Sequence, residues 1–162
     1  MTKVETSVMI EAPLENVYAF ASDWRNFLRY STYIRDVRPL TEKTLGEGAE
    51  LGLKVKFRGL PLNALWRGVG EANTQGWAFD AKLMGRWARK TWRLSPVDNG
   101  TRLTFVLEYT MPPIPLLANL MDRLWMRPGW ERIYAESFAN LKQVMETESG
   151  AVAADASETS PA

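Results

Sequence analysis

The stretch VETSVMIEAPLENVYAFASD, residues 4–23, predicts one strand followed directly by one short helix. One face of this stretch carries Val4, Thr6, Val8 and Ile10, and the other carries Glu5, Ser7, Met9 and Glu11, which is the two-residue period of a half-buried strand. Pro13 ends that strand, because proline has no backbone N–H for a sheet and is tolerated in the first turn of a helix. Apolar residues then recur at helical spacing over residues 14–21. We therefore expect the chain to open with a strand that leads straight into an amphipathic helix.

The remainder of the chain predicts an antiparallel sheet followed by a long helix. Trp130–Thr147 carries a single apolar stripe at helical spacing, and Pro128-Gly129 is expected to separate it from an earlier helical stretch. A striped helix needs an apolar partner, which a sheet of half-buried strands supplies. We predict an α+β fold with a curved antiparallel sheet of about six strands around this helix, and two short helices after the first strand. Period-two alternation between turn signals marks residues 51–57, 64–72, 77–83, 86–94 and 103–109.

Length and charge indicate one folded domain with a tail. The 162 residues are enough for a single domain with a sizeable core. The 20 basic and 19 acidic residues are intermixed, so no basic patch predicts a nucleic-acid partner. Ser149–Ala162 is rich in Ala, Ser and Thr and has no basic residue, which is typical of a disordered segment. We predict a folded domain over residues 1–147 and a disordered acidic tail over residues 148–162.

The sequence contains neither cysteine nor histidine, and this excludes several kinds of chemistry. Disulfides, metal sites built on thiolate or imidazole, cysteine catalysis and Ser-His-Asp catalysis all need one of these residues. A catalytic base would have to be a carboxylate, lysine or tyrosine with a shifted pKa. We therefore predict no metal, no cofactor and no catalytic residue, and favour a protein that is not an enzyme. The lack of cysteine, of a signal-peptide pattern and of a long apolar run leads us to expect a cytoplasmic location.

Aromatic side chains are the main candidates for a binding site. One helix leaves part of the inner face of a six-stranded sheet uncovered, which leaves room for a cavity, although core packing by the seven tryptophans fits the pattern as well. Arg67 and Asp80 are the charged groups considered for such a cavity, and alternation with its neighbours favours solvent for Asp80. The candidate ligand-binding residues are Phe27, Tyr30, Tyr33, Trp66, Trp77, Phe79, Trp92, Phe105, Tyr109, Trp125, Trp130, Tyr134 and Phe138.

Pro112–Trp130 is the second distinctive stretch. It has a broad apolar face, with Arg123 and Arg127 beside it. One interpretation is a lid that gates the cavity and touches a membrane surface transiently, where tryptophan and arginine favour the interface. Leu60-Pro61-Leu62, predicted as a loop, would join that contact if it lay at the same end of the molecule. The other interpretation is a helix packed across the mouth of the fold.

Five short elements follow one another along residues 3–147, namely Val4–Pro13, Ser22-Asp23 leading into Trp24–Tyr33, Gly46-Glu47-Gly48, Asn99–Leu103 and Glu136–Lys142. In this order and spacing they resemble the SRPBCC superfamily, and in particular its START-like, polyketide cyclase/dehydrase-like and coenzyme Q-binding-like branches. The resemblance implies a helix-grip fold, in which the sheet wraps a long C-terminal helix and usually encloses an apolar ligand.

The resemblance to aromatase/cyclases is incomplete at the level of residues. Gly70 and Ala72 stand near the positions where that branch implies a serine and an arginine, while Phe27 and Tyr33 match its aromatic positions. The Pro-Trp-Cys element of the coenzyme Q-binding branch is absent from residues 29–33. The leading hypothesis is therefore binding, sequestration or transfer of a hydrophobic small molecule that is lipid-, isoprenoid- or polyketide-like. The alternatives are a cofactor-independent cyclase/dehydrase-type enzyme and an accessory module that docks on another protein.

Overall fold

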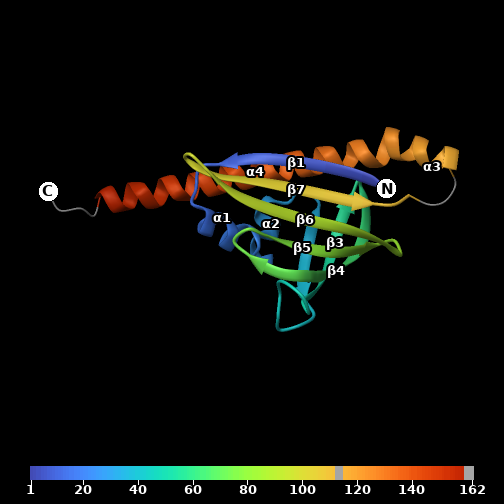
Figure 1. Cartoon of the computed structure of the whole chain (residues 1–162), viewed down its shortest axis with the longest axis horizontal. Helices are drawn as coiled ribbons and strands as arrows, with labels where there is room; N and C mark the ends of the chain where they lie inside the picture. The colour runs from blue at the N-terminus through green and yellow to red at the C-terminus, as the bar shows by residue number, and fades with distance from the viewer. Residues whose placement is uncertain (112–114, 159–162) are drawn as a thin grey trace.

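The fold is built on a single antiparallel sheet, as the computed structural model shows for the backbone of residues 1–111 and 115–158 and for their side chains except 115 and 149–158. In that part of the chain the sheet has seven strands in the order β1-β7-β6-β5-β4-β3-β2 (Figure 1). Each strand pairs antiparallel with its neighbours. The strands are β1 (Thr2–Ile10), β2 (Ile34–Pro39), β3 (Glu50–Phe57), β4 (Leu60–Asn73), β5 (Gly76–Leu83), β6 (Arg86–Val97) and β7 (Gly100–Tyr109).

Helices follow the first strand and the last strand. The long helix α4 packs along β1 and against α2, and it runs across one side of the sheet (Figure 1). This arrangement confirms the predicted α+β helix-grip fold. The elements are α1 (Leu14–Ala21), the 3-10 turn η1 (Trp24–Asn26), α2 (Phe27–Tyr30), α3 (Pro115–Met121), the π-helical turn η2 (Asp122–Met126) and α4 (Arg127–Glu158).

The sheet has one strand more than the approximate number that the sequence predicts. The additional strand, β2, pairs with β3 at the edge of the sheet. A register shift lies between Ile34 and Asp36. The buried residues Ile34 and Val37 are consequently three positions apart. This spacing conceals the two-residue period by which a strand is identified.

The expected interruption at Pro128-Gly129 is absent, because η2 leads directly into α4. The π-helical turn lies close to Pro128 in the sequence. Both a π-helical turn and a proline commonly distort the hydrogen bonding of a helix, and here the two distortions occur in the same part of the helix. Gly129 contributes differently: a Cβ atom there would lie 2.9 Å from Cζ of Phe57, so glycine allows the end of β3 to approach the helix. At its other end α4 continues to Glu158 and so includes residues 148–158. The division into a folded domain over residues 1–147 and a tail over residues 148–162 stays a proposal.

A second close approach joins the loop after β2 to strand β4. The backbone N–H of Glu47 donates to the carbonyl of Gly70 at 2.7 Å, and the N–H of Gly68 donates to the carbonyl of Ala49 at 2.9 Å. A Cβ atom at Gly68 would lie 1.8 Å from the carbonyl oxygen of Gly46. Glycine at this position therefore allows the two stretches of backbone to approach each other closely.

The core between sheet and α4 is rich in aromatic rings. Trp77 and Trp92 stack with centroids 5.5 Å apart and planes at 11°. Phe105 joins this group to α4, because its ring centroid lies 4.9 Å from that of Trp92 and 4.2 Å from that of Tyr134. The packed rings occupy one part of the interior, and the cavity lies in another.

Candidate ligand cavity

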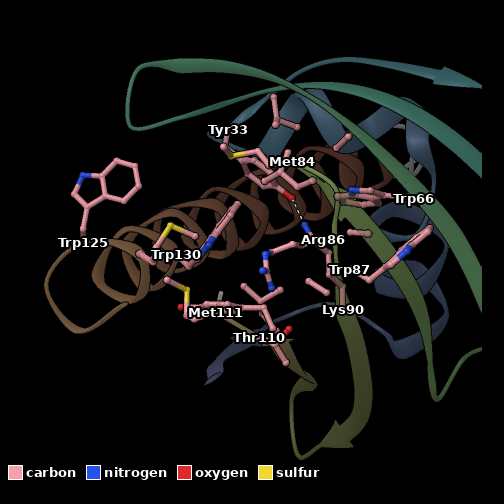
Figure 2. A pocket seen from close by; sticks show the side chains of 18 of the residues that line it. Tyr33, Trp66, Met84, Arg86, Trp87, Lys90, Thr110, Met111, Trp125 and Trp130 are labelled. Atoms are coloured by element: carbon pink, nitrogen blue, oxygen red, sulfur yellow. Dashed lines mark hydrogen bonds between the residues drawn. The ribbon is translucent and has the colours of Figure 1, made fainter. Parts of the chain in front are cut away.

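A cavity of about 290 Å³ lies between strands β3–β7 and the segment formed by α3, η2 and the start of α4. Figure 2 shows Trp66 and Lys90 on one side of it, with Trp125 and Met111 on the other. The lining side chains are mostly apolar. Five of the aromatic residues singled out in the sequence line it, namely Tyr33, Trp66, Tyr109, Trp125 and Trp130.

Partly exposed apolar side chains border the outer end of the cavity. Met84 and Trp87 come from the β5–β6 hairpin and are 76% and 40% exposed, and Met121 at the end of α3 is 46% exposed. The turn between β3 and β4 lies at the same end, because Cζ of Arg58 is 5.6 Å from the centroid of the Trp125 ring. The cavity therefore opens between two hairpins and the α3–η2 segment.

The inner side of the cavity carries a buried lysine. Lys90 lies in the middle of β6, on the same face as Trp92 and Leu94, and it is only 4% exposed. Its ammonium donates hydrogen bonds to the hydroxyl oxygen of Tyr33 at 2.6 Å and to that of Tyr134 at 2.8 Å. The two tyrosines come from the connection before β2 and from α4, so three separate parts of the fold meet at this amine.

Aromatic faces complete the surroundings of this amine. Nζ of Lys90 lies 4.2 Å from the ring centroid of Trp66, and it lies within 6 Å of the centroids of Tyr33, Tyr134 and Trp130. In the described part of the chain no carboxylate forms a salt bridge with Lys90. The side chain is thus held by hydroxyls and π-faces alone.

Burial shifts the proton equilibria of this group. Desolvation lowers the pKa of Lys90 well below its ordinary value of 10.5, because a charged amine is costly in an apolar interior. Desolvation also raises the pKa of Tyr33 and of Tyr134, so both phenols stay protonated near neutral pH.

A second polar contact fastens the helical side of the cavity to the sheet. The carboxylate of Asp122 in η2 accepts hydrogen bonds from the Tyr109 hydroxyl in β7 and, at 2.6 Å, from Oγ1 of Thr2 in β1. Burial and the neighbouring carboxylate raise the pKa of Tyr109. Asp122 is therefore engaged by the sheet, and it does not line the cavity.

The other sequence-predicted residues lie outside the main cavity. Arg67 and Asp80 are on the outer face of the sheet, where they pair with Glu50 and Arg89. Trp77, Phe79 and Phe105 are core residues. A small space of about 20 Å³ is lined by Tyr33 and Trp66 together with Phe27, Tyr30, Trp92, Tyr134 and Phe138.

Several lining residues went unrecognised in the sequence. Lys90 is the most consequential, and its signal was the alternation that places it on one face with Trp92 and Leu94. The others gave no signal, because methionines next to turns do not reveal the direction in which they point. They include Met84, Met111, Met121 and Met126.

Solved structures share this fold at low sequence identity. Protein TTHA0849 from Thermus thermophilus is 19% identical with a TM-score of 0.76, and the match covers 91% of this chain and 99% of that chain. The Zhui aromatase/cyclase from Streptomyces sp. R1128 is 17% identical with a TM-score of 0.73, covering 90% and 93%. Protein CV1439 from Chromobacterium violaceum is 15% identical with a TM-score of 0.68, covering 90% and 99%. At such identities the likeness shows the fold alone.

The sequence itself places the chain in a family. No curated protein matches it. The family model described as polyketide cyclase / dehydrase and lipid transport matches residues 1–146, which confirms the resemblance seen in the sequence. The chain therefore belongs to the polyketide cyclase/dehydrase and lipid-transport family.

Proposed function

We propose that this protein binds, sequesters or transfers a hydrophobic small molecule that is lipid-, isoprenoid- or polyketide-like. The observation that carries the proposal is the apolar cavity of about 290 Å³, close to the lower end of the 300–1,000 Å³ typical of ligand pockets. Methionine side chains adapt their shape to what they contact, which suits a site that accepts and releases an apolar molecule. Four methionines line the cavity, namely Met84, Met111, Met121 and Met126.

Burial alone gives such a site useful affinity. Removing about 300 Å² of apolar ligand surface from water contributes about 7.5 kcal/mol. The loss of translational and rotational freedom on association offsets part of this gain. We therefore expect dissociation constants around micromolar or weaker for a purely apolar ligand.

The ligand would enter past α3 and η2 through transient contact with a lipid surface. Leu116 and Leu124 are 90% and 69% exposed at this end of the molecule, with Arg123 and Arg127 beside them. Exposed leucines next to arginines suit the interface of an anionic membrane. No helix in the described residues has the length and apolar character needed to span a bilayer. Residues 112–114 of the predicted lid lie outside the described residues.

Sedimentation with anionic phospholipid vesicles tests this contact. Leu124→Glu should reduce the bound fraction several-fold, because it places a charge where the apolar face would enter the interface. Leu28→Glu is the matched control, since Leu28 is 50% exposed on α2, away from α3 (Figure 1). Equal binding of both variants would contradict the proposed contact.

A cyclase/dehydrase-type reaction is a second candidate function. The cluster of Lys90 with Tyr33 and Tyr134 favours it, because the amine of Lys90 and the phenol of Tyr33 line the apolar cavity, and the phenol of Tyr134 hydrogen-bonds to that amine. If the protein is such an enzyme, Tyr33→Phe should lower turnover and leave substrate binding largely intact. If it is a carrier, the same variant should still bind the ligand, and no product should form with either protein.

Native mass spectrometry of freshly purified protein, followed by organic extraction, tests the binding function. We expect a discrete apolar adduct on the wild-type chain. Ala81→Leu fills the cavity and should remove the adduct, whereas Ala78→Leu on the same strand lies outside the cavity and should retain it. A clean apo mass, together with no uptake of added apolar probes, would overturn the proposal and favour the docking-module alternative.

A further inference from the structure

The charges that line the cavity have one sign. Lys90 lies on its inner side and Arg86 near its mouth, and among the residues that the structure describes no aspartate or glutamate lines it. Asp122, which follows the lining residue Met121 in the chain, already accepts hydrogen bonds from Tyr109 and Thr2. A cavity with cationic groups and without acidic ones favours an anionic group on whatever enters it.

Within the described part of the chain, the inner lysine also has no carboxylate as an ion-pair partner, which a buried amine usually has. A protonated lysine carries three N–H donors, and hydrogen bonds to Tyr33 and Tyr134 use two of them. Lysine is almost never fully buried unless it is paired with an opposite charge. Desolvation accordingly lowers the pKa of Lys90. A ligand that brought an acidic group to Nζ would supply the missing charge and accept the third hydrogen bond.

The aromatic residues around Nζ strengthen this preference. Trp66, Trp130 and the two tyrosines present ring faces to the amine, and such faces stabilise a cation. An ion pair formed there is shielded from water, so its attraction is stronger than at an exposed site. A neutral hydroxyl in the same place would gain only an ordinary hydrogen bond.

We infer that the natural ligand is an apolar acid, with one carboxylate or comparable anionic group bound to Lys90 and an apolar body that extends from Trp66 towards Trp125. The inference rests on the proposed binding function and specifies the class of ligand. Tyr33 and Tyr134 act as positioning residues, because they hold the amine where the acidic group arrives. The cavity volume suits either a medium-length acyl chain or a compact ring system.

Titrations with three probes test this assignment. Decanoate and decan-1-ol share an apolar chain and differ in charge, whereas 2-naphthoate carries the same acidic group on a flat body. Tryptophan fluorescence follows binding, because Trp66 and Trp130 line the cavity, and native mass spectrometry checks stoichiometry. Lys90→Met removes the charge at similar length, and Lys54→Met on the exposed face of β3 is the matched control.

The wild-type chain should bind one of the acids at least about tenfold more tightly than decan-1-ol. Lys90→Met should abolish this preference, and Lys54→Met should keep it. Tighter binding of decanoate or of 2-naphthoate shows whether the ligand body is chain-like or flat. Equal affinity of the wild type for acids and alcohol, or an unchanged preference in Lys90→Met, would overturn the inference and leave the binding function standing. Binding of none of the probes, at a clean apo mass, would overturn both.

Discussion

The hydroxyl of Tyr109 hydrogen-bonds to the carboxylate of Asp122, and this contact joins the last strand of the sheet to the π-helical turn beside the cavity. Thr2 reinforces it from the first strand, at 2.6 Å. The turn also carries Trp125, which borders the cavity. The position of the helical side of the cavity relative to the sheet therefore depends on one buried carboxylate.

Tyr109→Phe should destabilise the protein by about 1–3 kcal/mol, because a buried carboxylate loses a hydrogen-bond donor. The free energy of unfolding from urea titration measures the effect. Ser7→Ala serves as control, since its hydroxyl contact with Thr104 is exposed and its loss should cost little. If the two variants unfold at the same urea concentration, the proposed fastening role of Asp122 is wrong.

The free energy of unfolding should rise with pH up to about pH 10. Burial lowers the pKa of Lys90 in the folded chain below its ordinary value of 10.5, which it keeps in the unfolded chain. At a pH between the folded and the unfolded pKa, the unfolded chain holds one more proton, so the free energy of unfolding increases with pH. The slope is at most about 1.4 kcal/mol per pH unit for one proton. Above pH 10.0 the free energy of unfolding should instead fall with pH, because Tyr33 and Tyr134 lose their protons at a lower pH in the unfolded chain than in the folded one.

Urea unfolding between pH 7 and pH 11 measures this profile. Lys90→Met should remove the rise and retain the fall at high pH, because the two phenols are still buried. A rise of the same slope in the variant would assign the effect to groups other than Lys90.

Gly68→Ala should destabilise the chain by more than 2 kcal/mol, because the new Cβ atom would lie 1.8 Å from the carbonyl oxygen of Gly46 and backbone cannot yield as a side chain can. Gly52→Ala is the matched control in the neighbouring strand, where the nearest atom would be 3.7 Å away. That variant should be neutral or more stable by about 0.5–1 kcal/mol. Thermal unfolding of both proteins gives the comparison, and similar losses at both positions would refute the close approach.

Gly129→Ala sets two effects against each other. Alanine favours the helix by about 1 kcal/mol, but its Cβ atom would lie 2.9 Å from Cζ of Phe57 and 2.9 Å from Nε of Arg58, whose flexible side chain can move away. That ring cannot move aside easily, because it stacks on Trp130 with centroids 4.4 Å apart. We expect crowding to prevail, with a net loss of about 1–2 kcal/mol.

A double-mutant cycle checks this assignment. Phe57→Leu shortens the crowding side chain, so Gly129→Ala should cost less in that background than in the wild type. The same cost in both backgrounds would show that the crowding lies elsewhere.

The strands whose alternation is regular were predictable from the sequence. Leu103, Phe105, Leu107 and Tyr109 are all buried, as their two-residue spacing indicated. The edge strand β2 was not, because its bulge removes that spacing. Pro128 was misinterpreted for a similar reason, since local sequence does not reveal a π-helical turn that leaves the helix continuous.

Lys90 shows why the site was harder to predict than the fold. A lysine in an alternating strand is ordinarily assigned to solvent, because burying its charge is costly. Here its two hydrogen-bond partners stand 57 and 44 positions away along the chain, in Tyr33 and Tyr134. The alternation in β6 places Lys90 on the same face as Trp92 and Leu94, but only the folded arrangement brings Tyr33 and Tyr134 to its amine, so the sequence could not show how a buried lysine would be accommodated.

The stacked pair Trp77 and Trp92 has a spectroscopic consequence. Their rings are nearly parallel and lie outside the main cavity, and their indole N–H groups have no hydrogen-bond partner among the described residues. Electronic transitions of two indoles held in this way couple, and the coupling depends on the pairing of β5 with β6. The molecule thus contains an optical reporter of sheet integrity in its circular dichroism, separate from the fluorescence of Trp66 and Trp130 that a ligand would change.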